Sequence, residues 1–343
     1  MVGVTCGKQD GSRTTRGGPL VKHVVLGGDG FLGRHLADAL ADRGETVIVG
    51  DIEKNATGIY DRVEHRHVDI SDPGSLRRVA IGPGDVVHHL ASRQYKRDVP
   101  RRARAGYFES VNITGTANIL RWMAEGGADR LILFSTDMVY GVPLGVPVGV
   151  DHPQRPLGPY GDSKRRSEEL CLAARAAGLR VTILRPRLII GPGAHGALDQ
   201  LFRLVRHHLP VPMIGSGRNR YQMVSVFDCV GAALCALAAR VPDAEYNLGS
   251  RNPPPVRELL GQLIARAGSH SPLIPLPSRP IKWVLGALDG LGLPLLYREQ
   301  YGIADVDYVV ETARTERELG WSPRDADVDM LCAAYEDYRR RRA

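Results

Sequence analysis

The sequence has no long apolar run, and this absence excludes an integral membrane protein built from helices. Among the 343 residues there is no stretch of eighteen consecutive apolar residues, the length that a membrane-spanning helix needs. The first twenty residues also lack the apolar core of a signal peptide. We therefore predict a soluble, cytoplasmic protein without a membrane partner, in which residues 1–19 form a disordered leader.

Cysteine is also scarce, and its five residues are too scattered to form a redox or metal motif. They are Cys6, Cys171, Cys229, Cys235 and Cys332. Their number is odd, and no CxxC pair or Cys/His ligand spacing occurs. The pattern predicts neither a disulfide framework nor a metal site, and most of the cysteines are interpreted as small residues of the core.

The formal net charge is +7, but the positive charge is not concentrated. Arginines occur in every segment, with only short clusters at 101–104 and 339–342. The sequence shows none of the motif types of a nucleic-acid binder, so we interpret the basic residues as solvated faces and expect no nucleic-acid partner. An excess of positive charge would also suit an anionic small substrate.

No internal repeat occurs, but apolar runs alternate with amphipathic segments through the first half of the chain. The alternation predicts a doubly wound α/β fold, in which helices cover both faces of a parallel sheet. The expected strands are 21–26, 46–50, 64–68, 85–90, 130–135 and 180–185. The expected helices lie near 31–43, 73–80, 108–125 and 160–177.

After Pro186, glycine and proline interrupt this alternation. The change predicts a smaller C-terminal lobe of short strands and isolated helices. Asp228 is the expected N-cap of a helix at 229–240, and the proline-rich segment 272–280 is interpreted as a linker. Further helices are expected near 256–267, 280–290, 312–319 and 326–340.

A glycine motif lies between the first expected strand and the first expected helix. In VVLGGDGFLGRHLADAL, Gly27, Gly30 and Gly33 form GxxGxxG. The first glycine permits a tight turn, the second lets the backbone approach a pyrophosphate, and the third lets helix and strand pack closely. The motif predicts a dinucleotide site. Residues 20–186 are therefore interpreted as the NAD-binding Rossmann domain, and 187–343 as mainly a substrate-binding lobe with some segments returning to the Rossmann domain.

Two aspartates follow the next strands. Asp51 ends the second strand, where its carboxylate can accept hydrogen bonds from the adenosine ribose and would repel a 2′-phosphate. This placement favours NAD over NADP, although Asp51 could instead cap the following turn. Asp69 could face the adenine. Alternatively, the segment Ser71-Asp72-Pro73 that follows it could cap the N-terminus of the next helix.

The segment Tyr160-Gly161-Asp162-Ser163-Lys164 is a YxxxK motif that places a phenol and an ammonium one turn apart on a helix. A positively charged lysine would lower the pKa of the tyrosine, which could then take a proton from an alcohol as hydride leaves to a nicotinamide. The alternative is an unrelated surface tyrosine and lysine.

A second group of hydroxyls ends the fifth expected strand. The run LILFSTDMVYG presents Ser135, Thr136 and Asp137 at the carboxyl edge of the sheet, where open α/β proteins bind ligands. Thr136 is the hydroxyl that we expect to hydrogen-bond the reacting oxygen and hold it against Tyr160. Asp137 could bind a sugar hydroxyl or cap the local backbone.

Taken in order, these motifs resemble the extended short-chain dehydrogenase/reductase superfamily, especially its nucleotide-sugar epimerases and dehydratases, over residues 21–322. Further matching segments are HLAS at 89–92, VNITGTANIL at 111–120, LRPRLIIGPG at 184–193 and ELGWSP at 318–323. The resemblance implies a Rossmann-type fold, bound NAD, a small-molecule substrate and a homodimer.

The resemblance also implies roles for individual residues. Thr136, Tyr160 and Lys164 take the catalytic roles, and Asn112 supports the catalytic region. The cofactor contacts carried over are Gly27, Gly30, Phe31, Leu32, Gly33, Asp51, Asp69, Ile70, Leu90, Ala91, Ser92, Tyr160 and Lys164. The substrate contacts carried over are Asp137, Met138, Asn112, Arg187, Arg220 and Arg298.

Three departures from the family pattern narrow the reaction. Met138 stands where dehydratases carry a glutamate, and because methionine cannot abstract a proton, a 4,6-dehydratase is disfavoured. Leu188 replaces the usual substrate-binding asparagine. Tyr221 occupies the position of a phosphate-binding arginine, with Arg220 adjacent. Arg220 could still clamp a pyrophosphate, and Arg298 is another anion-binding candidate or a solvated arginine.

The leading hypothesis is an NAD-dependent epimerase of a nucleotide-linked sugar, which oxidises a ring hydroxyl to a keto intermediate and returns hydride to the other face. The alternative is an NAD-dependent dehydrogenase or ketoreductase of a sugar or a sterol-like alcohol. A third hypothesis is a non-catalytic NAD-binding protein, because a fold alone does not establish turnover.

Overall fold

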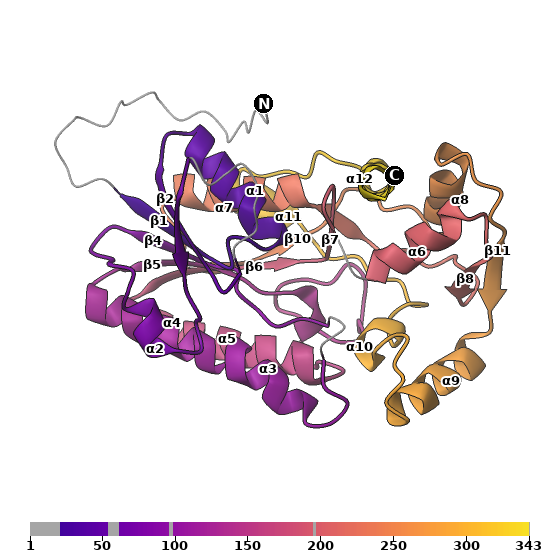
Figure 1. Cartoon of the computed structure of the whole chain (residues 1–343), viewed down its shortest axis with the longest axis horizontal. Helices are drawn as coiled ribbons and strands as arrows, with labels where there is room; N and C mark the ends of the chain where they lie inside the picture. Colours follow the sequence, from indigo (N-terminus) through magenta and orange to yellow (C-terminus); the bar gives the residue numbers. More distant parts are fainter. Residues whose placement is uncertain (1–20, 54–61, 96–98, 195–196, 343) are drawn as a thin grey trace.

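The computed structural model describes residues 21–53, 62–95, 99–194 and 197–342. Its centre is a seven-stranded sheet with the order β10-β6-β5-β4-β1-β2-β3 (Figure 1). The strands are β1 (Lys22–Leu26), β2 (Thr46–Asp51), β3 (Glu64–His67), β4 (Val86–His89), β5 (Arg130–Phe134), β6 (Arg180–Pro186) and β10 (Ala244–Leu248). Every pair in the sheet is parallel, which confirms the α/β Rossmann-type fold and its six expected strands.

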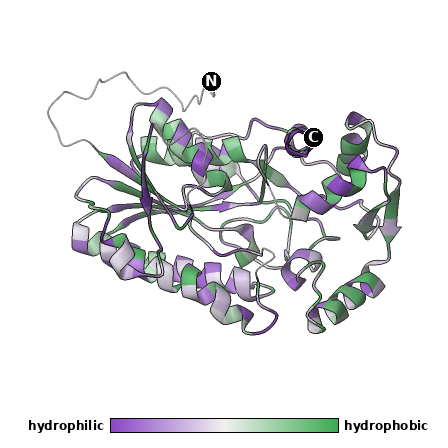
Figure 2. Ribbon diagram, viewed as in Figure 1, coloured by the Kyte–Doolittle hydropathy of each residue, from purple (hydrophilic) through white to green (hydrophobic). Residues whose placement is uncertain are grey.

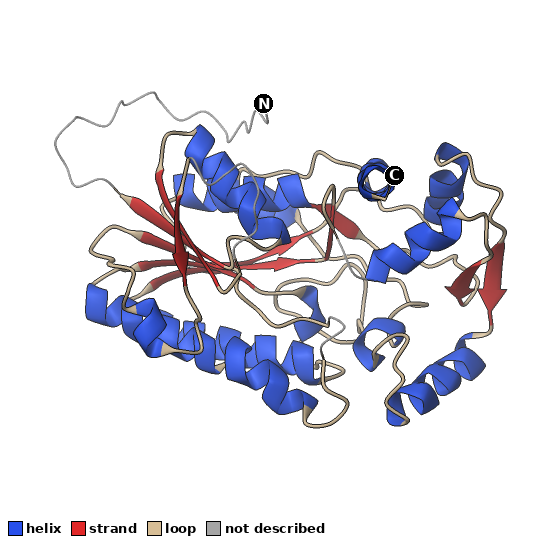
Figure 3. Ribbon diagram, in the orientation of Figure 1, coloured by secondary structure: helices blue, strands red, loops and turns tan. Residues whose placement is uncertain are grey.

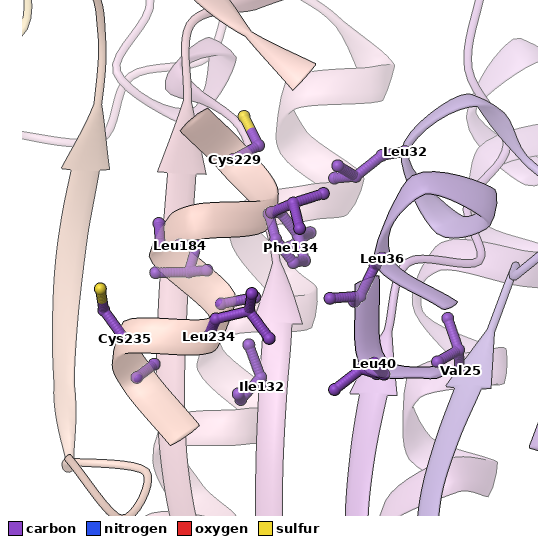
Figure 4. Packing of buried hydrophobic residues seen from close by; sticks show 14 of the residues in the cluster. Val25, Leu32, Leu36, Leu40, Ile132, Phe134, Leu184, Cys229, Leu234 and Cys235 are labelled. Carbon is purple, nitrogen blue, oxygen red and sulfur yellow. The ribbon is translucent and has the colours of Figure 1, made fainter. Parts of the chain in front are cut away.

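Helices cover both faces of the sheet, as Figure 3 shows. One face carries α1 (Phe31–Asp42), α7 (Val226–Ala238) and α11 (Ala313–Leu319), and the other carries α2 (Pro73–Leu76), α3 (Arg104–Asn112), α4 (Thr114–Gly126) and α5 (Pro159–Ala176). Alternate strand residues serve the two faces: Ile132 and Phe134 pack with α1 and α7, whereas Leu131 and Leu133 pack with α4 (Figure 4). β1, β2, β5 and β6 are largely apolar because both faces are buried, whereas the edge strand β3 is polar and mostly exposed.

Three helices differ from the expectation. The helix expected over 73–80 is the four-residue α2, which ends at Leu76. The helix expected over 108–125 is divided at Ile113 into α3 and α4. The helix expected from 229 begins at Val226, and its N-cap is Ser225, whose hydroxyl accepts the Phe227 N–H. Asp228 is not the cap: its carboxylate accepts backbone N–H groups of residues 324 and 325 instead.

The smaller C-terminal lobe is built as expected from short strands and separate helices. The strands form two pairs, β7 (Leu188–Ile190) with β9 (Met223–Ser225) and β8 (Val211–Ile214) with β11 (Leu273–Leu276). The helices are α6 (Ala197–Arg206), α8 (Val256–Arg266), α9 (Ser278–Gly290), α10 (Arg298–Tyr301) and α12 (Asp327–Arg341). The segment 272–280 is not a free linker, because it contains β11 and the start of α9. β10 belongs to the large sheet, and α7 packs on it.

Four of the five cysteines lie in the described part of the chain. Cys171, Cys229 and Cys235 are buried in the core and Cys332 is partly buried, while Cys6 and the expected leader lie outside the described residues. Within the described ranges, no cluster of His, Cys, Asp and Glu is placed to hold a metal ion. No helix in that part of the chain has the length and apolar character needed to cross a bilayer.

Candidate active site

The glycine-rich turn joins β1 to α1 with almost no space for side chains. Gly27 has φ +82°, and a Cβ there would lie 2.5 Å from the backbone nitrogen of Ala91. A Cβ at Gly33 would lie 2.2 Å from the carbonyl oxygen of Gly27. Glycine is therefore required at both positions by the close approach of two backbones.

The N-terminus of α1 has the features of an anion site. Its N-cap is Gly30, so no side chain caps the helix, and its first turn contains no acidic residue. Phe31 and Leu32 begin the helix beside this uncapped end. The first amide N–H groups of a helix need acceptors, and the positive end of the helix dipole favours an anion. These residues fit the pyrophosphate of a dinucleotide.

Asp51 lies at the end of β2, directly beside this turn. Its carboxylate accepts the Asp29 N–H at 3.0 Å and the Glu53 N–H at 3.3 Å. Burial raises the pKa of Asp51, although the backbone hydrogen bonds act in the opposite direction. The Asp29 carboxylate also forms a hydrogen bond with the His65 ring of β3 at 2.5 Å, a contact that the sequence did not predict.

Asp69 makes its hydrogen bonds within its own turn. Its carboxylate accepts the backbone N–H of Ser71 at 2.8 Å and the Ser71 hydroxyl at 2.6 Å. The N-cap of α2 is Asp72, which confirms the expected capping by the Ser71-Asp72-Pro73 segment. Ile70 is buried against Gly115 of α4, where an added Cβ would lie 2.5 Å from its side chain. A contact of Asp69 or Ile70 with the cofactor stays a prediction.

The loop after β4 connects the glycine-rich turn to α5. Leu90 donates its N–H to the carbonyl of Leu26 at 2.9 Å, and Ala91 abuts Gly27. Ser92 donates its hydroxyl to the Asn112 side-chain oxygen at 3.2 Å.

Asn112 fastens this loop to the helix that carries the YxxxK motif. Its side-chain oxygen accepts the Arg93 N–H at 2.8 Å, and its side-chain nitrogen donates to the Ser163 hydroxyl at 2.8 Å and to the Arg93 carbonyl at 3.1 Å. Asn112 is buried, so these contacts hold the loop after β4 at a fixed distance from α5.

Thr136, Tyr160 and Lys164 are all buried at the carboxyl end of the sheet. Thr136 and Ser92 are hydrogen-bond partners of the Tyr160 phenol. The Lys164 ammonium donates to the Phe134 carbonyl at 2.8 Å. The alternative of a surface tyrosine and lysine is therefore wrong, because both side chains point into the protein beside the end of β5.

The expected direction of the Tyr160 pKa is corrected by the structure. Burial raises this pKa, Glu299 and Asp137 raise it further, and the hydrogen bonds with Thr136 and Ser92 lower it by less. Burial also lowers the pKa of Lys164 to about 8. The lowering of the tyrosine pKa that the motif predicted does not appear, because desolvation of the buried phenol is the largest effect on it.

Two expected substrate contacts, Asp137 and Arg187, bind each other. They form a buried ion pair. The Arg187 guanidinium lies over the Tyr308 ring at 4.0 Å and the Tyr221 ring at 4.5 Å, and the Tyr308 hydroxyl donates to the Asp137 carbonyl at 2.8 Å. Burial works to lower the pKa of Arg187, but Asp137 and the two tyrosines hold it above its usual value.

The other expected substrate contacts have different environments. The exposed Arg220 forms an ion pair with Asp307. Arg298 is exposed at the start of α10. Met138 is half-buried, and its backbone N–H donates to the Thr136 hydroxyl at 3.2 Å. Of these three residues, only Met138 forms a hydrogen bond with the group of Thr136, Tyr160 and Lys164.

Glu299 is a buried carboxylate of the C-terminal lobe that the sequence analysis missed. It accepts the Gly161 N–H at 3.0 Å and also the Tyr160 N–H, so it caps the N-terminus of α5. The N-cap residue of that helix is Gly158, which has no side chain, and a Cβ there would lie 2.7 Å from the Glu299 carboxylate.

Burial raises the pKa of Glu299 to about 7. No local pattern could have identified this residue, because its partner lies 138 residues away in the sequence.

Comparisons with known proteins identify relatives of this chain. The model of a family described as NAD dependent epimerase/dehydratase matches residues 23–249. A putative UDP-glucose 4-epimerase of Methanocaldococcus jannaschii is 30% identical over 246 residues, 69% of this chain and 79% of that protein.

The 2-alkyl-3-oxoalkanoate reductase of Stenotrophomonas maltophilia is 28% identical over 263 residues, 73% of this chain and 76% of the reductase. A solved UDP-glucose 4-epimerase of Thermotoga maritima, with UDP-glucose, superposes with a TM-score of 0.76 at 24% identity. The superposition covers 94% of this chain and 100% of the epimerase chain, so the two proteins share the fold.

Proposed function

Because this chain belongs to the NAD-dependent epimerase/dehydratase family of extended short-chain dehydrogenases/reductases, with NAD as its cofactor, we propose that it epimerises a nucleotide-linked sugar. The reaction runs through transient oxidation of a ring hydroxyl and return of hydride to the opposite face of the keto intermediate. The observation that carries the proposal is the buried group of Thr136, Tyr160 and Lys164 beside the glycine-rich turn.

Each residue of this group has a proposed task. NAD, when bound, supplies the hydride acceptor and a positive charge on its nicotinamide ring. The Tyr160 oxygen takes the proton of the substrate hydroxyl and later returns it. Thr136 hydrogen-bonds the same substrate oxygen. The Lys164 ammonium, one helical turn from Tyr160, would offset part of the rise in the Tyr160 pKa that burial causes.

The surroundings of Asp137 argue further against a 4,6-dehydratase. Such an enzyme needs an acid to protonate the leaving hydroxyl and a base to remove a proton from carbon. The Asp137 carboxylate is paired with the buried Arg187 guanidinium instead of facing a substrate hydroxyl, and Met138 offers no base. The group of Thr136, Tyr160 and Lys164 supports the transfer of a hydride from a carbinol carbon and of a proton from its hydroxyl.

A dehydrogenase or ketoreductase of a sterol-like alcohol is the second candidate. Arg220 is a candidate for binding the pyrophosphate of a nucleotide, but at the surface it already forms an ion pair with Asp307. The apolar Leu188 stands where a substrate-binding asparagine is expected, and its side chain is exposed. Both observations suit a less polar substrate, and the catalytic group would be the same.

We also propose the assignment of cofactor binding and substrate binding to two parts of the chain that the sequence predicts. Residues 20–186 would hold NAD, and 187–343 would form most of the substrate site, with β10 and α7 completing the large domain. The proposed homodimer rests on the family resemblance.

Two measurements separate the candidates. The first is extraction of small molecules from the purified protein: tightly held NAD supports an internal redox cycle, whereas exchangeable NAD supports a dehydrogenase. The second is incubation with a panel of sugar nucleotides and of secondary alcohols, with the variant Tyr160→Phe as the control. The epimerase proposal is overturned if no sugar changes configuration while an alcohol reduces added NAD.

A further inference from the structure

Helix α9 and the loop that follows it present apolar side chains to the outside of the protein. Trp283, Val284, Leu291, Leu293 and Leu295, which we call the α9 patch, are all exposed, and Trp283 is 75% exposed. Val284 and Leu291, seven residues apart, lie on one side of the helix and its C-cap, and Trp283 lies at the edge of the same broad apolar face. Figure 2 shows this helix, at the edge of the C-terminal lobe, coloured mainly as hydrophobic.

The patch belongs to a helix that is well anchored on its other side. Leu285 is buried, and the Lys282 ammonium donates to the Gly302 carbonyl at 2.9 Å and forms an ion pair with Asp305. The opposite face of α9 is therefore fixed to the segment after α10. The exposed apolar side chains are a stable feature of the surface.

Arginines surround the patch, and the nearby acids are already paired. Arg279 is exposed in the first turn of α9. Arg101 and Arg102 are exposed too, and a Cβ at Gly292 would lie 2.8 Å from the Arg101 side chain, which places this basic segment beside the patch. Asp289, the acid at the end of α9, is bound by Arg104 at 2.7 Å.

We propose that the α9 patch docks on the surface of an anionic lipid bilayer. The apolar side chains would enter the boundary between headgroups and acyl chains, and the arginines would contact lipid phosphates. Tryptophan suits this boundary because its ring is apolar and its N–H is polar. The docking goes beyond the proposed reaction and departs from the sequence-based expectation of no membrane partner.

The charge around the patch disfavours a second copy of this chain as the occupant. In a two-fold symmetric dimer, the same surface faces itself. The arginines of both copies would then approach one another, while Asp289 and Asp305 are held in ion pairs within each copy. An anionic surface would neutralise these arginines.

The test uses the intact protein and vesicles of phosphatidylcholine, with or without phosphatidylglycerol. The chain has three tryptophans, and Trp122 and Trp321 are buried, so a blue shift of the fluorescence on adding vesicles reports Trp283. We expect co-sedimentation and a blue shift with the anionic vesicles only. Binding should weaken at about 0.5 M salt, where charges are screened beyond about 4 Å.

Two variants and a matched control complete the experiment. Trp283→Glu with Leu291→Glu should reduce binding on the order of tenfold or more, and so should replacing Arg101, Arg102 and Arg279 by Gln. Val21→Glu alters an exposed apolar residue directly before β1, a strand that Figure 1 shows far from α9, and should leave binding unchanged. The arginine variant keeps the proposal testable if the glutamate variant does not fold.

Three outcomes would overturn the proposal. They are the absence of binding to anionic vesicles, equal binding to both kinds of vesicle, and a blue shift that depends on protein concentration alone. The last result would identify the patch as a contact between copies of this chain.

Discussion

Replacing Glu299 by glutamine tests whether the negative charge of this carboxylate, at the N-terminus of α5, makes the stability of the protein depend on pH and raises the pKa of Tyr160. Glu299→Gln removes the negative charge and keeps one oxygen that can accept the Gly161 N–H, while Glu299→Ala removes both. The glutamine variant therefore isolates the effect of charge, and the alanine variant adds the loss of the helix cap, worth about 1 kcal/mol.

The magnitude follows from the pKa of Glu299, which burial raises from 4.5 to about 7. A carboxyl whose pKa is raised on folding stabilises the protein below its unfolded pKa, and this contribution is lost as the pH rises through the folded pKa. A difference of about 2.5 pKa units corresponds to about 3 kcal/mol, of which about 2–3 kcal/mol is lost between pH 5 and pH 8.5. The glutamine variant should lack this loss.

The assay is urea unfolding of the wild-type protein and the glutamine variant at pH 5 and pH 8.5. Other titrating groups contribute equally to both proteins, so the difference between their pH dependences isolates Glu299. Because Glu299 also raises the pKa of Tyr160, the pH at which the oxidation rate rises should be lower in the variant. If both proteins show the same pH dependence of unfolding and of rate, the reasoning is refuted.

Three further predictions concern the described site. Tyr160→Phe should lower the rate of hydride transfer by about 10²–10⁴-fold while NAD affinity, measured by calorimetry, stays unchanged; weaker NAD binding would point to a structural role. Arg187→Met leaves Asp137 as an unpaired buried charge and should lower the free energy of unfolding by about 3–5 kcal/mol in urea titrations, and adding Asp137→Leu should recover most of it. Gly33→Ala places a carbon 2.2 Å from the Gly27 carbonyl oxygen and should destabilise the protein by about 1–3 kcal/mol while weakening NAD binding, both measured by thermal shift; unchanged melting with NAD would contradict the close approach.

The sequence by itself determined the elements whose signals are local. The glycine motif between β1 and α1 and the placement of Asp51 could be read from the spacing of neighbouring residues. Apolar runs also identified the inner strands of the large sheet, because strands buried on both faces are continuously apolar. The edge strand β3 is polar and mostly exposed, so no such run marks it. The strand at 244–248 was missed, since AEYNL contains two polar residues and its pairing with β6 is not visible in its own composition.

Only the tertiary structure decided which distant groups meet. It brought the Glu299 carboxylate to the N-terminus of the helix carrying Tyr160, and it paired Asp137 with Arg187 instead of leaving both open to a substrate. It also reversed the expected direction of the Tyr160 pKa, because the sequence shows the neighbouring Lys164 but not the desolvation of the phenol. Burial and contacts between residues far apart in the chain depend on how all the elements pack, so no local spacing can encode them.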